Sequence, residues 1–250
     1  LDVVINSGVS SLMTELDMTH TVSGSSGARV LVDSISYTSS LGERTTAFFS
    51  LGGDANGSSL YNQACVYGAQ ADTLSNCGVS AANLDVDGLD TAMGASFDFD
   101  NGFTTSIAYE GQGSTNSGFL TNEGRDAYGA QVAYTTENYG VSVAWANIEN
   151  SNLTGATQSV GLNGFYSPDL PNFPSISAGL ESNHDDSETN SSIDQTSHYF
   201  IGLQWDELGD GTLGAAVGSK EPYAENADAS TMYEVFYSYN YADGITVTPL

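Results

Sequence analysis

The chain has 250 residues and carries 4 basic against 31 acidic side chains, a formal net charge of −27. Because Lys and Arg neutralise phosphates, their scarcity argues against a nucleic-acid partner and disfavours docking on anionic lipid headgroups. No stretch approaches the roughly 18 to 20 apolar residues of a membrane-spanning helix. The mean hydropathy of −0.18 suits a soluble protein, but it suits a transmembrane β-barrel equally well, since lipid-facing and water-facing residues alternate there.

Alternation of apolar and small or polar residues, in runs of about ten, predicts strands that pair as hairpins across short turns. The clearest hairpin is Thr91–Glu110, which turns at Asp100–Gly102, where Asn and Gly tolerate positive φ. Six hairpins, or about twelve strands, follow in chain order: Val32–Tyr37 with Thr45–Leu51, the two arms of Thr91–Glu110, Ala127–Tyr134 with Tyr139–Ile148, Val160–Tyr166 with Ile176–Glu181, His198–Trp205 with Thr212–Gly218, and Met232–Tyr239 with Ile245–Leu250.

Long polar links join these hairpins, whereas the turns within them are short. The long links are Gly53–Asp90, Gly111–Asp126, Asn150–Ser159, Ser182–Ser197 and Glu221–Thr231. This asymmetry predicts an all-β fold, an antiparallel up-and-down transmembrane β-barrel. We expect its short turns in the periplasm, and the loops Gly53–Asp90 and Ser182–Ser197 outside the cell. Before the hairpins, Leu1–Ile5 could form a strand and Ser7–Gly27 a loop or a small inserted element.

Strand length and aromatic placement favour the membrane. Strands in soluble sandwiches average about five or six residues, whereas a tilted crossing of the bilayer takes about 9 to 11. Aromatic residues such as Phe97, Phe103, Tyr134 and Tyr139 flank the short turns repeatedly. We interpret them as girdles at the level of the lipid headgroups, although aromatics also favour strands in general.

Charged and amide side chains recur on the strand face opposite the aromatics. In a barrel this face is the water-filled lumen. Seven residues are therefore predicted to line the pore: Arg44, Asp98, Glu110, Gln131, Glu181, Gln204 and Glu234. Their excess of carboxylates predicts a modest preference for cations. The alternative is that they are scattered polar residues of the lumen with no selective role.

Two cysteines and one acidic stretch are candidates for further chemistry. Cys65 and Cys77 lie twelve positions apart in the longest polar link, which in an exported protein predicts a disulfide, with two free thiols as the alternative. Asp85, Asp87 and Asp90 resemble the opening of an EF-hand loop without its bidentate Glu, so they are weak calcium candidates beside an ordinary acidic turn. We expect no other metal, no cofactor and no enzymatic activity, because catalytic motifs are missing.

The C-terminal hairpin Met232–Leu250 resembles the penultimate hairpin of cyanobacterial outer-membrane porins, which are related to the carbohydrate-selective porin family. Further matches are Val32–Tyr37, the loop with both cysteines, and Gly209–Gly214, so the resemblance covers most of Gly27–Leu250 and is closest to marine forms. It implies a homotrimer in outer-membrane lipid that passes small hydrophilic solutes and inorganic ions.

Members of that family usually carry a surface-layer-homology domain and a coiled coil before a 16-stranded barrel. Residues 1–250 are therefore expected to form a porin β-barrel domain that lacks the N-terminal periplasmic domain and the last strands. The leading hypothesis for function is a passive outer-membrane channel, selective through pore width and charged lining. The alternative is an acidic cell-surface binding or structural β-protein.

Overall fold

A single antiparallel sheet contains all fifteen strands of the computed structural model. The structure describes residues 2–6, 10–19, 29–52, 56–71, 74, 76–84, 86, 89–112, 124–150, 154–186, 195–220, 222–224, 227–242 and 245–249, with side chains from Ser34 onward except those of Ala242 and Ile245. Two short 3-10 helices, η1 (Gly57–Leu60) and η3 (Ala81–Asn83), lie within residues 56–84. Across the described ranges, no helix has the length and apolar character needed to cross a membrane.

Strands that follow each other in the chain are neighbours in the sheet. The bounds are β1 (Asp2–Asn6), β2 (Ser10–Thr19), β3 (Arg29–Ser40), β4 (Thr45–Gly52), β5 (Thr91–Asp98), β6 (Phe103–Gly111), β7 (Asp126–Thr135), β8 (Tyr139–Glu149), β9 (Ala156–Tyr166), β10 (Ser175–Asp185), β11 (Gln195–Leu208), β12 (Gly211–Ser219), β13 (Tyr223–Ala224), β14 (Thr231–Ala242) and β15 (Ile245–Val247). The two-residue β13 pairs with β11 beyond the end of β12, and β14 then pairs with β12. The predicted up-and-down topology is confirmed.

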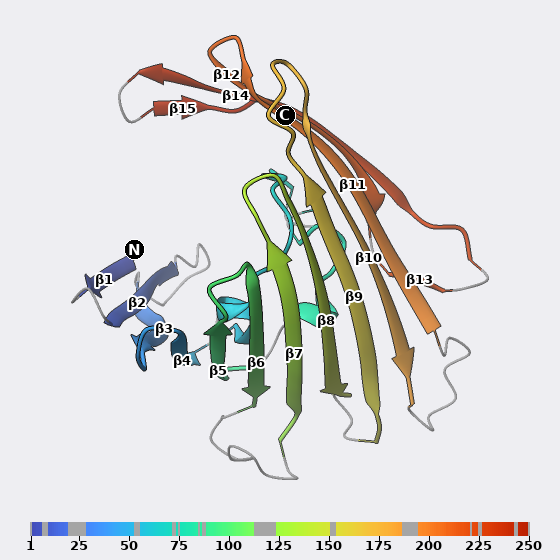
Figure 1. The fold of residues 1–250 in the computed structure, drawn as a ribbon. Coiled ribbons are helices and arrows are strands. Elements are labelled where there is room, and N and C mark those ends of the chain that lie inside the picture. Colours follow the sequence, from blue (N-terminus) through green and yellow to red (C-terminus); the bar gives the residue numbers. More distant parts are fainter. Residues whose placement is uncertain are drawn as a thin grey trace, which may run out of the picture.

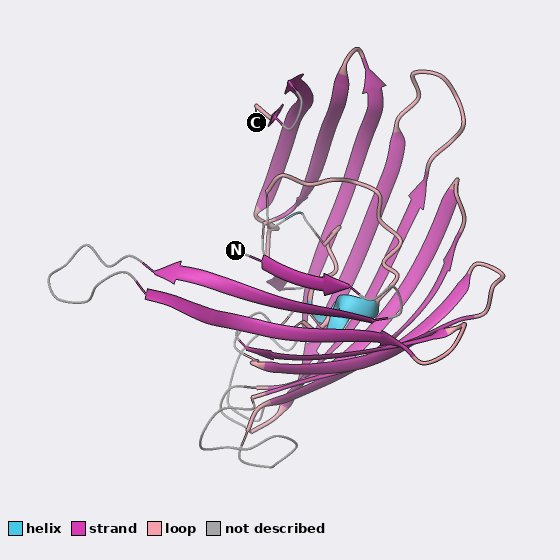
Figure 2. Ribbon diagram, turned by 90° about the vertical axis from the view of Figure 1, so that its left-hand side faces the viewer, coloured by secondary structure: helices cyan, strands magenta, loops and turns pink. Residues whose placement is uncertain are grey.

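The sheet curves into a deep trough, with both short helices in its hollow (Figure 2). In the described residues β1 and β15 form the two edges, each pairing on one side, so the sheet is not closed. The short turns after β5, β7, β9 and β11 lie at one end of the sheet (Figure 1). The turn between β5 and β6 shows why the hairpins are tight, since Asp100 and Gly102 adopt positive φ of 59° and 89°.

Successive side chains alternate between the convex and the concave face of the sheet, as the sequence predicted. Along β8, Val141, Val143 and Trp145 are exposed on the convex face, whereas Ser142 and Ala144 are buried on the concave face. Large apolar residues of other strands share the exposed convex face, among them Ile107, Val132, Leu162, Leu180, Ile201 and Val235. Hydrocarbon solvates such a surface well and water does not, so the convex face suits a lipid environment.

Two parts of the chain differ from the expected elements. Residues 10–19, expected as a loop or inserted element, form β2 and pair with β3 through a register shift between Glu15 and Leu16. The link expected at Ser182–Ser197 is shorter, because β10 continues to Asp185 and β11 begins at Gln195. Polar residues occupy both strand ends, so the alternation of apolar residues did not predict that these residues are part of the strands.

Candidate functional site: the inner face and the segment that crosses it

The link between β4 and β5 folds back along the concave face of the sheet. We call residues 56–84 the crossing segment; residues 72, 73 and 75 within it lie outside the described residues. Its η1 contacts β4, β5 and β6, and its η3 contacts β7, β8 and β9. Tyr67 and Cys77 pack with Phe200 and Phe236 on the far side of the trough. The expectation of an external loop at Gly53–Asp90 is therefore wrong for this part.

Glycines on the inner face make room for the crossing segment. A Cβ atom on Gly179 of β10 would overlap the carbonyl oxygen of Cys77, and one on Gly161 of β9 would overlap a methyl group of Val79. On β11, a Cβ of Gly202 would lie 2.7 Å from the ring of Tyr67. Three neighbouring strands thus omit a side chain where the segment passes.

Three of the predicted pore-lining carboxylates hold the crossing segment by its backbone. Glu110 accepts a hydrogen bond from the Gly57 amide at 2.5 Å, and Glu181 accepts one from the Ala82 amide at 2.9 Å. Glu234 accepts from the Ala71 amide at 2.5 Å and from the Tyr67 hydroxyl at 2.8 Å.

The solvent-exposed fraction is 0% for Glu110, 3% for Glu181 and 4% for Glu234. Their expected place on the inner face is correct, but the expectation that they face water is not, because the crossing segment covers them. Hydrogen bonds to an ionised carboxylate are stronger than neutral ones. The acids therefore act as anchors for the segment.

Between these anchors, neutral side chains of the sheet accept hydrogen bonds from the backbone amides of the crossing segment. Ser142 accepts from the Ala64 amide at 3.0 Å, Ser177 from the Val66 amide at 3.1 Å, and Gln204 from the Gly68 amide at 2.8 Å. On β7, the buried Gln131 donates to the side-chain oxygen of Asn83 at 3.3 Å. A backbone that leaves water needs partners for its amides, and the small polar residues of the inner face provide them.

The two tyrosines of the segment keep their protons. Burial raises the pKa of the Tyr67 hydroxyl above its ordinary value, and the hydrogen bond to Glu234 and its charge raise this pKa further. Burial, followed by the charge of Glu110, also raises the pKa of Tyr61. Tyr67 therefore stays a hydrogen-bond donor to Glu234 throughout the neutral range.

The structure joins Cys65 and Cys77 in a disulfide, with their Cα atoms 6.4 Å apart. The bond links the extended part of the segment to the turn before η3, and Cys77 is fully buried. Closing a loop of this size stabilises a fold by about 3 kcal/mol. We expect alkylation of the unreduced protein to add no label to either residue in a mass spectrum. Two labelled thiols would contradict the bond.

Arg44 and Asp98 remain accessible beside the crossing segment. They line a hollow of about 280 Å³, together with Asn62 of the segment and Thr104 of β6. Arg44 forms an ion pair with Asp100 of the adjacent turn, and both side chains are about half exposed. Positive and negative groups thus lie together at the short-turn end of the inner face.

The calcium candidates cannot be compared with the structure as a set. Asp85 and Asp87 lie outside the described residues, and Asp90 precedes β5. In the parts of the chain that are described, no three His, Cys, Asp or Glu side chains converge on a point where a metal ion would fit. Calcium at Asp85, Asp87 and Asp90 stays a prediction.

Sequence reasoning missed the crossing segment itself. A signal was present in Gly161, Gly179 and Gly202, which point inward on three consecutive strands and are offset by two residues from one strand to the next, along a diagonal of the sheet. Glycine is otherwise depleted in strands, so its recurrence on one face of a wall indicates the close approach of another backbone.

Comparison with known proteins gives the fold and the family. No curated protein matches the chain. Two variants of the Rhodobacter blastica porin match with TM-scores of 0.59 and 0.58 at 12% and 13% identity, each over 99% of this chain and 81% of the porin. Outer-membrane expressed OmpT of Vibrio cholerae matches with a TM-score of 0.52 at 10% identity, over 94% of this chain and 78% of OmpT. These likenesses show a shared porin fold.

The family follows from the sequence. A family model described as Gram-negative porin matches residues 13–248, nearly the whole chain. The apolar convex face and the small, polar concave face suit a membrane barrel of this kind. The chain therefore belongs to the Gram-negative porin family, whose members reside in the outer membrane.

Proposed function

We propose that this porin is a passive channel, through which small hydrophilic solutes and inorganic ions diffuse along the concave side of the wall. The crossing segment carries this proposal, because it occupies the hollow and is held there by residues of β6, β10 and β14. In a passive channel such a segment would narrow the lumen, and diffusion past it would need no energy source. Selectivity then depends on the remaining width and on accessible charges.

Insertion of the purified protein into planar lipid bilayers tests the proposal. We expect stepwise increases in conductance in potassium chloride, and reduced conductance when neutral polymers small enough to enter the lumen are added. Large polymers should leave the conductance unchanged. A protein that stays in detergent micelles as a folded β-protein yet never produces conductance steps would contradict the channel.

Cation preference is the second part of the proposal. The net charge of −27 and the accessible Asp98 attract cations, and low salt strengthens this attraction because screening weakens. We expect the reversal potential in a potassium chloride gradient to show modest cation preference. Asp98→Asn should reduce it and Arg44→Gln should increase it, while Glu137→Gln on an exposed turn serves as a control of equal charge. Anion preference in dilute salt would contradict this assignment.

The solute class and the assembly are inferred from the resemblance to carbohydrate-selective porins. We infer a homotrimer in outer-membrane lipid, whose lumen admits small sugars besides ions. Liposome swelling with sugars of increasing size tests the solute class, and cross-linking in native membranes tests the trimer. If cross-linking yields only protein of single-chain mass, this would count against the trimer but not against the channel.

A further inference from the structure

Three asparagines of the chain, Asn56, Asn101 and Asn163, directly precede a glycine. The backbone nitrogen of the residue after an Asn can attack the amide carbon of the Asn side chain, and glycine has no side chain to hinder this approach. The attack requires that the backbone nitrogen can lose its proton and that the chain can move, as it does in exposed turns. The three asparagines differ in both respects.

The chain is held in place at Asn56 and at Asn163. The Gly57 amide, which follows Asn56, donates to the buried carboxylate of Glu110 at 2.5 Å. Asn163 is 2% exposed and lies within β9, where the next residue, Gly164, pairs with β8 on one side and β10 on the other. Attack at either asparagine would first have to break these contacts.

Asn101 is exposed in the short turn between β5 and β6. No described residue accepts a hydrogen bond from the Gly102 amide. The side-chain oxygen of Asn101 accepts a hydrogen bond from the Phe103 amide at 3.2 Å. Negative charge develops on this oxygen when the amide carbon is attacked, so the Phe103 amide stabilises the intermediate.

The hairpin itself requires glycine after Asn101. Gly102 has a φ of 89°, and a Cβ atom at this position would lie 2.9 Å from the carbonyl oxygen of Thr135. A side chain that would hinder the attack therefore cannot be accommodated at position 102 without disturbing the turn.

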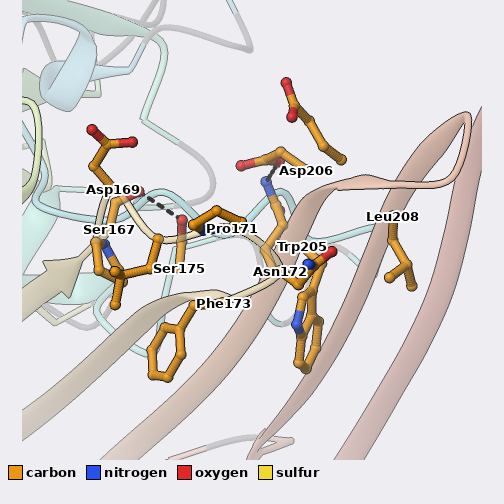
Figure 3. A pocket seen from close by; sticks show the side chains of 13 residues that line it. Ser167, Asp169, Pro171, Asn172, Phe173, Ser175, Trp205, Asp206 and Leu208 are labelled. Atoms are coloured by element: carbon orange, nitrogen blue, oxygen red, sulfur yellow. Dashed lines mark hydrogen bonds between the residues drawn. The ribbon is translucent and has the colours of Figure 1, made fainter.

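Exposure in a turn is not sufficient for the attack. Asn172 is exposed in the β9–β10 turn, but it precedes Phe173, whose amide donates to a carbonyl of the same turn at 3.2 Å (Figure 3). Asn138 is exposed in the β7–β8 turn, and the amide of the next residue, Tyr139, donates to a threonine hydroxyl at 3.1 Å. In both turns the following residue carries a bulky side chain and its amide is engaged.

We propose that Asn101 is a site of spontaneous conversion to isoaspartate and aspartate. The Gly102 nitrogen gives up its proton and bonds to the side-chain carbon of Asn101, and the bond from that carbon to the amide nitrogen breaks, which releases ammonia. Water then opens the cyclic imide at either carbonyl. Both products add a negative charge beside Asp100, the partner of Arg44. The conversion does not depend on conduction through the lumen.

Peptide mass spectrometry of the folded protein, incubated in detergent micelles at mildly alkaline pH, tests the site. We expect Asn101 to lose its amide at least about tenfold faster than Asn56 and Asn163, since breaking a hydrogen bond to a charged group slows a step by about that factor. The rate at Asn101 should rise with pH, because hydroxide removes the Gly102 proton. Asn138 and Asn172 should keep their amides.

Incubation in urea provides the comparison with the unfolded chain. Asn56, Asn101 and Asn163 should then react at similar rates, because the contacts of Gly57 and Gly164 are lost. An isoaspartyl methyltransferase should label residue 101 in the incubated folded protein. Asn101→Ser is the matched variant, since Ser keeps an oxygen for the Phe103 amide and has no amide to lose, and its turn should take up no label.

Two results would overturn the proposal. The first is equal rates of amide loss at Asn101 and Asn163 in the folded protein. The second is aspartate without isoaspartate at residue 101, because direct hydrolysis rather than the imide would then be responsible. Both are read from mass spectra of the unaltered protein, so neither depends on the folding of a variant.

Discussion

Replacing Gly179 by Ala should displace the crossing segment and raise the conductance of the channel. The new Cβ would overlap the carbonyl oxygen of Cys77 and lie 2.6 Å from the side-chain nitrogen of Asn163. Neither neighbour can yield easily, because Cys77 is held by the disulfide and Asn163 donates to that same carbonyl at 3.1 Å. Overpacking of this kind typically costs about 1–3 kcal/mol, which the chain can avoid by releasing the segment from β10.

Single-channel conductance and urea unfolding of the variant measure the two consequences. Gly164→Ala on the neighbouring β9 is the matched control, since its Cβ would meet nothing nearer than 3.4 Å. We expect the control to conduct like the unaltered protein. If Gly179→Ala and Gly164→Ala conduct alike and unfold at the same urea concentration, the segment does not lie against β10 in the membrane.

Removing the carboxylate of Glu234 should loosen the middle of the crossing segment. Glu234→Ala leaves the buried Tyr67 hydroxyl and the part-buried amides of Gln70 and Ala71 without their acceptor. A buried donor that loses a charged partner costs about 1–3 kcal/mol, so we expect the free energy of unfolding to fall by about 3 kcal/mol. The current should also fluctuate more, because the released middle of the segment moves within the lumen.

Glu234→Gln separates charge from geometry in this experiment. Gln keeps one acceptor oxygen, so we expect an intermediate loss of stability and smaller current fluctuations than in Glu234→Ala. Exposed Glu137 again provides the control, and Glu137→Ala should leave stability within about 0.5 kcal/mol. Identical stability of Glu234→Ala and Glu137→Ala would show that Glu234 is no anchor.

The hairpins were predictable from sequence because alternation is a local signal. All six predicted pairs are strand pairs of the sheet, and Asp100–Gly102 turns as its residues require. The same alternation assigned Glu110, Glu181 and Glu234 to the inner face correctly. It could not show that they are covered, because their partners Gly57, Ala82 and Ala71 lie 53, 99 and 163 positions away. Contacts between residues so far apart in the sequence depend on tertiary packing, which alternation within a strand does not report.

The anchors of the crossing segment also constrain the order in which the protein folds. They lie on β6, β10 and β14, so the last of them does not exist until eight neighbouring strands, from β6 to β14, have assembled. Contacts between residues so far apart in the sequence form late, because the chain loses the entropy of closing a long loop before the contacts can stabilise the fold. The disulfide spans only 12 positions and requires none of the wall. The chain can therefore oxidise to a small closed ring first, and this ring docks as a preformed unit once the wall surrounds it.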